Sequence, residues 1–307
     1  MGILSDILNQ SQLAGGVYFC HTFKNHWGLD IKQPRSGVFH ILIKGEATLG
    51  YNGKLIKLKE GDLIALPRAK PHWIAFDDRI KRRMPIMKFM SAYEYKTYNS
   101  EVSDSDKSTL LCGHFSFNNP SHFPIFNQLP ECIHISTKTE NDIGWLKSLV
   151  IRMNQEAVNQ TIGSRSYLNS QVELLFIDMV RYWLARDDSN SIFLKAAKEP
   201  LILQVLRTFH ASPEVHYKLD NLAALVGMSR ASLYNKFIET VGVAPMVYLS
   251  KWRIYIASNL LVTTNLPIIE IALRVGYQSD SALSKKFKAE IGMTPKKYRK
   301  THSVFSD

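Results

Sequence analysis

The sequence predicts an α+β multidomain protein, in which an N-terminal β-barrel with a helical hairpin precedes an all-α domain with two helix-turn-helix units. Three observations predict it. Short apolar runs alternate with turn residues up to about residue 90, helical periodicity replaces them after residue 140, and a helix-turn-helix pattern then occurs twice. At 307 residues the chain has room for two domains.

Residues 17–90 predict the barrel. Their apolar stretches are short and are separated by turn signals such as Asn52-Gly53. Many short strands with regular turns are typical of a barrel or a sandwich. Residues 91–109, rich in Ser, Asp, Lys and Asn, predict a loop, and we expect one more strand at 109–117.

Two segments at 141–159 and 164–186 predict a helical hairpin, because their apolar residues recur at helical spacing. The two stripes have to be buried. They either pack on the barrel or form a seam with a second copy of the chain, and both alternatives stay open. A linker is expected at 187–191, and Pro200 then opens a run of helices. The stripes consist of Ile143, Leu146, Val150, Met153 and Ala157, and of Leu168, Val172, Leu175, Met179 and Trp183.

A repeated pattern at 219–237 and 268–287 predicts the two helix-turn-helix units. In each copy alanine allows two helices to cross closely, glycine supplies the positive φ of a tight turn, and serine caps the next helix. The paired positions are Ala223 and Ala272, Gly227 and Gly276, Ser229 and Ser279, Leu233 and Leu283, and Phe237 and Phe287. Residues 245–261 predict one long helix between the copies, with proline in its first turn. Such a rod could hold both units over successive major grooves.

The charge is concentrated where these repeats lie. Residues 201–307 hold 14 Lys and Arg against 7 Asp and Glu, whereas residues 1–200 hold 24 against 20. A basic end suits a polyanionic partner such as DNA, although a basic solvated surface explains the charge equally well. The three scattered cysteines do not form a disulfide framework, and no apolar run is long enough for a membrane helix. We therefore expect a cytoplasmic protein with no membrane partner.

The repeats carry motifs that resemble the DNA-binding domain of the AraC/XylS family. These motifs are Gly-Met-Ser, Gly-x-x-Pro-x-x-Tyr-Leu from Gly242, Trp-Arg-x-x-x-Ala-x-x-Leu-Leu from Trp252, Ile-Ala-x-x-x-Gly-Tyr from Ile271, Phe-Lys at 287–288, and Gly-x-x-Pro-x-x-Tyr-Arg from Gly292. The resemblance implies a transcription regulator that binds double-stranded DNA at promoters and works with RNA polymerase. It implies no enzymatic activity and no cofactor.

The family's groove-facing positions, carried over by motif, fall on Ala231, Tyr234, Asn235, Ser281, Ala282 and Lys285. Asn235 has the chemistry to read adenine, Lys285 to donate to guanine, and an alanine to touch a thymine methyl. Five basic residues suit phosphates, which position the protein without reading sequence. They are Arg230, Lys236, Lys251, Arg253 and Lys286. For any of these positions, a solvated helix face is the alternative.

The N-terminal part resembles the cupin-type sensor domain of one AraC subgroup, through Gly45-Glu, 61–67, Pro71-His72 and 111–117. His40, His72 and His114 are weak candidates for metal ligands, because a closed site needs more convergent ligands than His40 and His72 supply. Paired polar histidines are the alternative, and we expect no metal.

Some members of that subgroup resemble oxidant sensors, which implies redox sensing through Cys20 and Cys112. A sensing thiol has to be accessible and has to have a lowered pKa. Two buried structural thiols are the alternative, and the sequence does not decide between them.

Together these features predict three parts: a sensor domain at 1–140, a hairpin at 141–190 that links and could dimerise, and a DNA-binding domain at 191–307. The predicted function is a transcription regulator, more specifically an activator, that responds to an unknown effector or to an oxidant. A metal-dependent cupin enzyme fused to a DNA-targeting domain is the alternative. A methyl-accepting DNA repair protein needs a cysteine-rich zinc cluster that three dispersed cysteines do not supply.

Overall fold

A computed structural model describes residues 13–24, 26–32, 34, 36–92, 107–117, 129–136, 144–186, 195, 196 and 198–302. The chain divides into two compact units. One holds Leu13–Ser116 and Leu129–Trp183, and the other is formed mainly by Leu184–Asp307. The expected linker at 187–191 and most of the expected loop at 91–109 lie outside the described residues.

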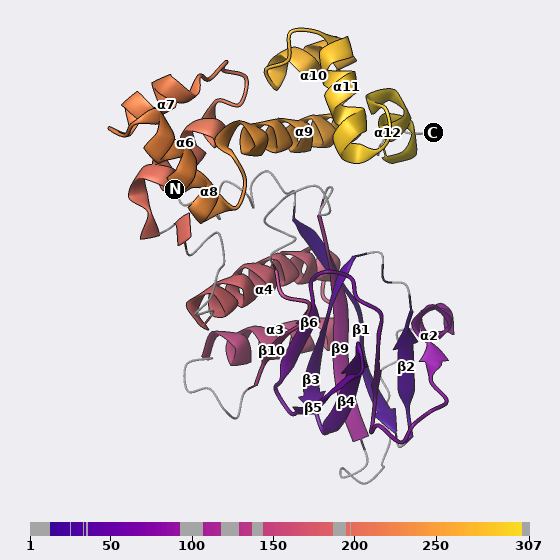
Figure 1. The fold of residues 1–307 in the computed structure, drawn as a ribbon. Coiled ribbons are helices and arrows are strands. Elements are labelled where there is room, and N and C mark those ends of the chain that lie inside the picture. The colour runs from indigo at the N-terminus through magenta and orange to yellow at the C-terminus, as the bar shows by residue number, and fades with distance from the viewer. Residues whose placement is uncertain are drawn as a thin grey trace. The chain divides into compact units, whose positions relative to one another are not determined.

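The N-terminal unit contains two five-stranded sheets, in the orders β1-β9-β3-β6-β10 and β5-β4-β7-β2-β8 (Figure 1). Neighbouring strands are antiparallel except for the parallel pair β2 and β8. The strands are β1 (Ala14–Lys24), β2 (Gly28–Ile31), β3 (Gly37–Lys44), β4 (Glu46–Tyr51), β5 (Lys54–Lys59), β6 (Leu63–Leu66), β7 (His72–Ala75), β8 (Met84–Pro85), β9 (Lys107–Ser116) and β10 (Ile133–Ile135). The expected run of short strands is confirmed, except that its last residues belong to helix α2 (Ile86–Ala92). The strand expected at 109–117 is β9, which begins two residues earlier.

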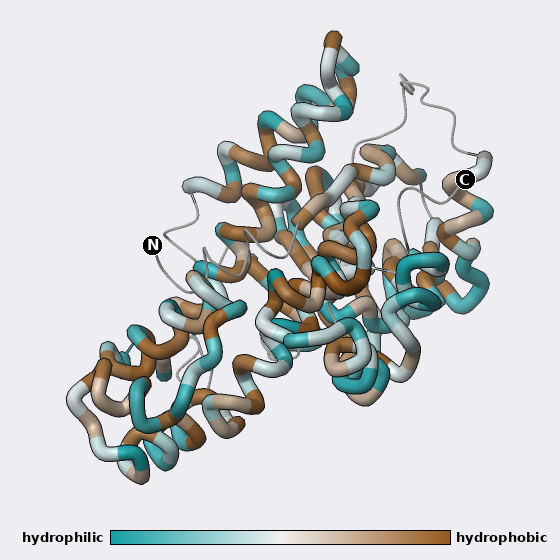
Figure 2. Tube along the Cα trace, turned by 90° about the horizontal axis from the view of Figure 1, so that it is seen from above, coloured by the Kyte–Doolittle hydropathy of each residue, from teal (hydrophilic) through white to brown (hydrophobic). Residues whose placement is uncertain are grey.

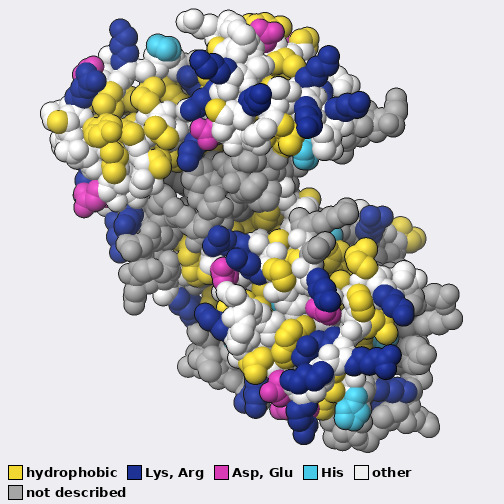
Figure 3. Space-filling view, turned by 45° about the vertical axis from the view of Figure 1, so that its right-hand side comes forward, with side chains coloured by type: hydrophobic (Ala, Val, Ile, Leu, Met, Phe, Trp, Pro, Cys, Tyr) yellow, Lys and Arg dark blue, Asp and Glu magenta, His cyan; other side chains and the backbone are white. Residues whose placement is uncertain are grey.

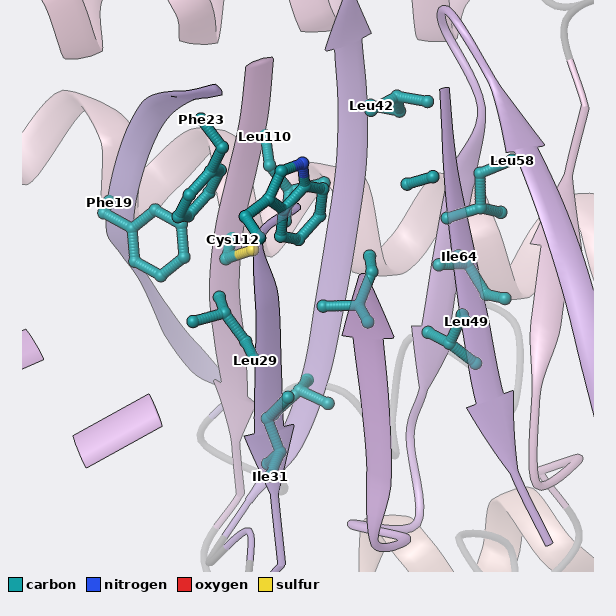
Figure 4. Close-up of a cluster of buried hydrophobic side chains, with 14 of the residues drawn as sticks. Phe19, Phe23, Leu29, Ile31, Leu42, Leu49, Leu58, Ile64, Leu110 and Cys112 are labelled. Atoms are coloured by element: carbon teal, nitrogen blue, oxygen red, sulfur yellow. The ribbon is translucent and has the colours of Figure 1, made fainter. Parts of the chain in front are cut away.

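A core of large apolar side chains fills the barrel. Phe19, Leu42 and Leu110 are fully buried, and Cys112 lies among these side chains (Figure 4). The chain turns tightly at Gly45, between β3 and β4, where φ is +86°. A Cβ at this position would lie 2.2 Å from the carbonyl oxygen of Lys107. Glycine is therefore required at that crossing.

Two helices, α3 (Gly144–Asn159) and α4 (Ser164–Arg186), form the expected hairpin. Their apolar stripes face the barrel, and apolar and polar residues alternate in bands along the long helices (Figure 2). Phe176 of α4 packs edge-on against Phe115 of β9, with ring centroids 5.1 Å apart. The hairpin thus packs its stripes on its own barrel, which is one of the two alternatives. Trp183 is only half-buried, and Ile143 lies outside the described residues. Helix α2 (Ile86–Ala92) packs near β2 and β8.

The C-terminal unit is helical. Helix α9 runs between one group of helices, α6 to α8, and a second group, α10 to α12 (Figure 1). The helices are α6 (Pro200–Ala211), α7 (Leu219–Leu225), α8 (Arg230–Val241), α9 (Pro245–Thr263), α10 (Ile268–Arg274), α11 (Asp280–Ile291) and α12 (Pro295–His302). The two helix-turn-helix units are therefore α7 with α8 and α10 with α11, joined by the long helix that the sequence predicts.

Candidate nucleic-acid interface

Helix α8 presents three of the six base-reading candidates to solvent. It begins after Ser229, whose hydroxyl accepts a hydrogen bond from the backbone N–H of Ser232 at 3.1 Å. Ala231, Tyr234 and Asn235 are exposed, and their spacing places them on one face of the helix. The opposite face is held in the core by residues that include Leu233 and Phe237, both fully buried.

Helix α11 repeats this arrangement. Ser279 caps it by accepting from the N–H of Ala282 at 3.1 Å, and Leu283 and Phe287 are fully buried. Ser281, Ala282 and Lys285 are exposed. Because the buried Leu and Phe fix the rotation of each helix about its own axis, the candidate residues form two defined outward faces. Each face has the polar and methyl groups that major-groove readout uses.

The turns that enter these helices have the backbone that the repeat predicts. Gly227 and Gly276 have φ values of +67° and +83°. A Cβ at Gly276 would also meet the guanidinium of Arg253 at 2.6 Å. Glycine is needed at the second turn for both its conformation and its space.

Four of the five candidate phosphate contacts lie at or near the surface. Arg230, Lys236 and Lys286 each pair with an acidic neighbour, at 3.5 Å to Asp220, 2.7 Å to Glu199 and 3.2 Å to Glu290, and Lys251 is half-buried. Arginine or lysine side chains with such exposed ion pairs remain able to exchange them for a phosphate, because surface pairs contribute little energy.

Arg253 is placed differently. Its Nε donates to the carbonyl oxygen of Pro213 at 2.7 Å, and its Nη2 donates to that of Val215 at 2.8 Å. Burial lowers the pKa of this guanidinium. Two of its donor groups are therefore committed to the loop before α7, an arrangement that favours a structural role over a phosphate contact.

Sequence reasoning passed over a basic group on α12 and at the end of α11. Lys288, Lys296, Lys297 and Lys300 are all exposed. Figure 3 shows lysine and arginine side chains spread over one face of this unit. The signal lies in the run Lys296-Lys297-Tyr298-Arg299-Lys300, in which four of the five residues are basic.

Comparison with known proteins identifies both units. Residues 3–185 match a family model described as Cupin, and residues 222–301 match one described as Helix-turn-helix domain. The chain belongs to the AraC family of helix-turn-helix transcription regulators that carry an N-terminal cupin domain. It is 27% identical over 99% of its length to an uncharacterized HTH-type transcriptional regulator of Haemophilus influenzae, covering 100% of that protein. The HTH-type transcriptional regulator AlkR of Acinetobacter baylyi is 26% identical, over 97% of this chain and 99% of AlkR. The RCS-specific HTH-type transcriptional activator RclR of Escherichia coli is 25% identical, over 85% of this chain and 83% of RclR.

These relatives are named as transcription regulators, which indicates a role other than catalysis for this AraC-family protein. Its DNA-binding domain makes DNA its partner. None of the helices in the described part of the chain is both long and apolar enough to span a membrane.

Inside the cupin domain, three candidate residues form one hydrogen-bonded chain. His72 Nδ1 lies 2.8 Å from the carbonyl oxygen of Lys70, His72 Nε2 lies 2.9 Å from His40 Nε2, and His40 Nδ1 lies 2.8 Å from Cys112 Sγ. A carbonyl only accepts, so His72 donates from Nδ1 and accepts at Nε2. His40 then donates from Nε2 and accepts at Nδ1, which leaves the Cys112 thiol as the last donor.

The burial of this chain of donors and acceptors keeps it neutral. Burial lowers the pKa of His40 well below its usual value and that of His72 to about 4, and it raises the pKa of the Cys112 thiol well above its usual value. His40 uses both ring nitrogens within the chain, so the three side chains do not converge on one point. No group of three or more His, Cys, Asp or Glu residues suited to a metal ion occurs in the described ranges.

The two other candidates lie on β1, which carries Cys20, and on β9, which carries His114. The Cys20 thiol donates to Asn154 Oδ1 of α3 at 3.3 Å, and burial raises its pKa to about 11. His114 stacks on Tyr18 with ring centroids 4.7 Å apart. Cys20 therefore connects the barrel to the hairpin, whereas His114 belongs to a different environment from His40 and His72.

Proposed function

We propose that this protein activates transcription by placing α8 and α11 in successive major grooves of promoter DNA, in response to a signal received by the cupin domain. The two capped helices with their exposed base-reading faces carry the proposal. Residues 1–140 act as the sensor, 141–190 as the connecting hairpin, and 191–307 as the DNA-binding domain. Recognition of promoter DNA by RNA polymerase is the step that it assists.

The base-reading roles divide between the two helices. Asn235 offers an amide that pairs bidentately with adenine, and Lys285 offers an ammonium that donates to guanine. Ala231 and Ala282 offer methyl groups, and Tyr234 and Ser281 complete the two faces. Arg230, Lys236, Lys251 and Lys286 contact phosphates and set the register of the protein on the duplex.

Selection of binding sites from random duplex DNA tests these roles. The full chain should select a bipartite site, and the variants Asn235→Ala and Lys285→Ala should each lose preference at one or two base pairs. The expected cost is about 1–3 kcal/mol at those positions. Glu239→Ala is the matched control on α8, because Glu239 is exposed one turn beyond Asn235.

Two outcomes would contradict the proposal. Uniform weakening on every sequence by Asn235→Ala or Lys285→Ala would mean that these residues contact only the backbone of DNA. A selected site that is contacted by one helix-turn-helix unit alone would mean that the second unit does not read sequence.

Activation and dimerisation rest on separate observations. The relative from Escherichia coli is named an activator, and this name supports activation here. A homodimer through the outer face of the hairpin is supported by exposed apolar residues spaced seven apart. They are Ile151 and Val158 on α3 and Tyr167 and Leu174 on α4. The stripes buried against the barrel take no part in it.

An oxidant signal, of the kind named for RclR, would act through Cys20 before Cys112, although burial raises the pKa of both thiols and so slows their oxidation. Cys112 is fully buried and donates to His40, whereas Cys20 is only partly buried. Hypochlorous acid would convert the Cys20 thiol to a sulfenic acid and release chloride and a proton. This change replaces the hydrogen bond to Asn154 and alters the contact between barrel and hairpin.

A reporter gene under the selected promoter tests this signal. Cys20→Ser should abolish the response of the reporter to hypochlorous acid. Cys132→Ser should leave the response intact, because Cys132 takes no part in the hydrogen bond between Cys20 and Asn154 of α3. An unchanged response in a Cys20→Ser, Cys112→Ser double variant would exclude both thiols as sensors.

A further inference from the structure

A pocket of about 810 Å³ lies beside strand β1, within the N-terminal unit. Its walls come from β1, from the end of α3, from the start of α4 and from Met90 of α2. This volume is in the range of small-molecule sites. The pocket does not include His40, His72 or Cys112, so it is separate from the buried hydrogen-bonded chain.

One end of the pocket is positive. Arg165 is the charged residue among the described lining residues, and none of them is acidic. Its guanidinium makes no hydrogen bond or ion pair with the other described residues, so its donors are available. The pocket also meets the first turn of α4, a 23-residue helix whose N-terminal end carries the positive pole of the helix dipole. Both features favour a negatively charged group at this end.

Two stacked rings form another part of the pocket wall. Tyr18 and His114 stack nearly parallel, at an interplanar angle of 18°. The Nδ1 atom of His114 is buried and has no hydrogen-bond partner among the described residues, although buried polar atoms are normally paired. Burial lowers the pKa of His114, so the ring is neutral near pH 7. Val17 and Leu168 add apolar surface.

Two glycines of β1 let the strand pack closely against α4 beside this pocket. A Cβ at Gly16 would lie 3.1 Å from His114 Cε1 and 3.2 Å from Asn169 Oδ1, and one at Gly15 would lie 2.3 Å from Val172 Cγ1. Strand β1 and helix α4 therefore approach closely at the pocket floor. The walls are set by the fold and do not need a ligand to form.

We propose that this pocket is a binding site for a small planar carboxylic acid, whose carboxylate pairs with Arg165 and whose flat apolar body lies against Tyr18 and His114. The inference rests on the proposed function, because such an acid would supply the signal that the cupin domain receives. Its ligand joins β1 to the turn between α3 and α4. Binding therefore changes how firmly the hairpin is held on the barrel.

Calorimetric titration of the full chain without DNA tests the site, with trans-cinnamate as the probe. Cinnamate should bind with one site per chain. Cinnamyl alcohol, which keeps the flat body and lacks the charge, should bind at least about tenfold more weakly, because a charge-assisted hydrogen bond is lost. 3-Cyclohexylpropanoate keeps the charge and lacks the flat body, and it should also bind more weakly.

Two variants locate the site. Arg165→Gln should weaken cinnamate binding about tenfold and leave binding of cinnamyl alcohol unchanged. Arg152→Gln is the matched control, because Arg152 is exposed on α3 and does not line the pocket. Circular dichroism confirms that both variants fold.

The proposal is overturned if cinnamate gives no binding heat at millimolar concentration, if Arg165→Gln leaves its affinity unchanged, or if Arg152→Gln weakens it equally. Selective binding of promoter DNA by the same protein sample distinguishes these failures from failure of the proposed function. A chain that reads its operator and ignores cinnamate contradicts this inference alone.

Discussion

Two arginines of the DNA-binding unit hold the loops that lead into the helix-turn-helix pairs. Arg253 donates to the carbonyls of Pro213 and Val215, just before α7. Arg299 donates to the carbonyl of Leu261 at the end of α9 and to that of Leu266 just before α10. Loop carbonyls near helix starts need donors when they are partly buried. The two arginines thus stabilise equivalent loops in the two halves of the DNA-binding unit.

Replacing Arg253 by methionine should lower the free energy of unfolding by about 1–3 kcal/mol, because two hydrogen bonds from a charged donor are lost. Arg274→Met is the control, since Arg274 makes an exposed ion pair with Glu270 and should cost far less. Urea denaturation measures both. If Arg253→Met keeps normal stability and its DNA affinity depends less steeply on salt, Arg253 contacts a phosphate, as the sequence predicts.

The buried imidazoles predict a loss of stability in acid. The pKa of His72 is about 4 in the folded chain and near 6.5 when unfolded, so the unfolded chain takes up the proton first as pH falls. Stability should therefore be complete above pH 6.5 and decline between pH 6.5 and 4, by on the order of 3 kcal/mol from this residue. Denaturation at several pH values should show a shallower decline for His72→Gln, in which an amide replaces the ring. An equal decline in both proteins would contradict the assignment.

Residues whose partners are local were predicted well from the sequence. The Ser229 and Ser279 caps each act within three residues, and so the sequence pattern contains the whole interaction. The partners of His40 and Arg253 are not local. His40 meets Cys112 because strand register sets them opposite each other on β3 and β9, 72 residues apart. No pattern in the sequence specifies that register, so the sequence alone leaves the histidines as candidate metal ligands and the thiol as a candidate sensor.

At the scale of the helices, the two caps should have measurable energies. Ser229→Ala and Ser279→Ala each remove the acceptor of an N–H at the start of a recognition helix, and each should cost about 1 kcal/mol of stability. Ser232→Ala is the control, because its contribution to the cap is its backbone N–H, which alanine keeps. Thermal unfolding measures the three variants. A loss for Ser232→Ala as large as for Ser229→Ala would mean that the hydroxyl of Ser229 is not the stabilising group.

Helix α9, between the two helix-turn-helix units, shows why the sequence predicts the architecture of the DNA-binding domain more fully than that of the cupin domain. Helix α9 begins at Pro245 and buries residues on every side, because it packs against both helix-turn-helix units. Its length and both repeats are visible as local periodicity. The cupin sheets depend on pairings between distant strands, such as β1 with β9, and the pocket beside β1 exists only through those pairings.

At the scale of the whole DNA-binding unit, α9 makes the spacing of the operator rigid. Its 19 residues span about 28 Å, and the centres of successive major grooves on one face of B-DNA are about 34 Å apart. Inserting about 5 base pairs between the two contacted segments should remove the second contact by moving it to the opposite face. Inserting about 10 should remove it as well, since a buried helix cannot lengthen. Footprinting by the full chain on the three operators measures both effects, with the unmodified site as control. Protection of both segments in the operator with the longer insertion would show that the two helix-turn-helix units move independently. Helix α9 would then not fix the distance between them, contrary to what its packing predicts.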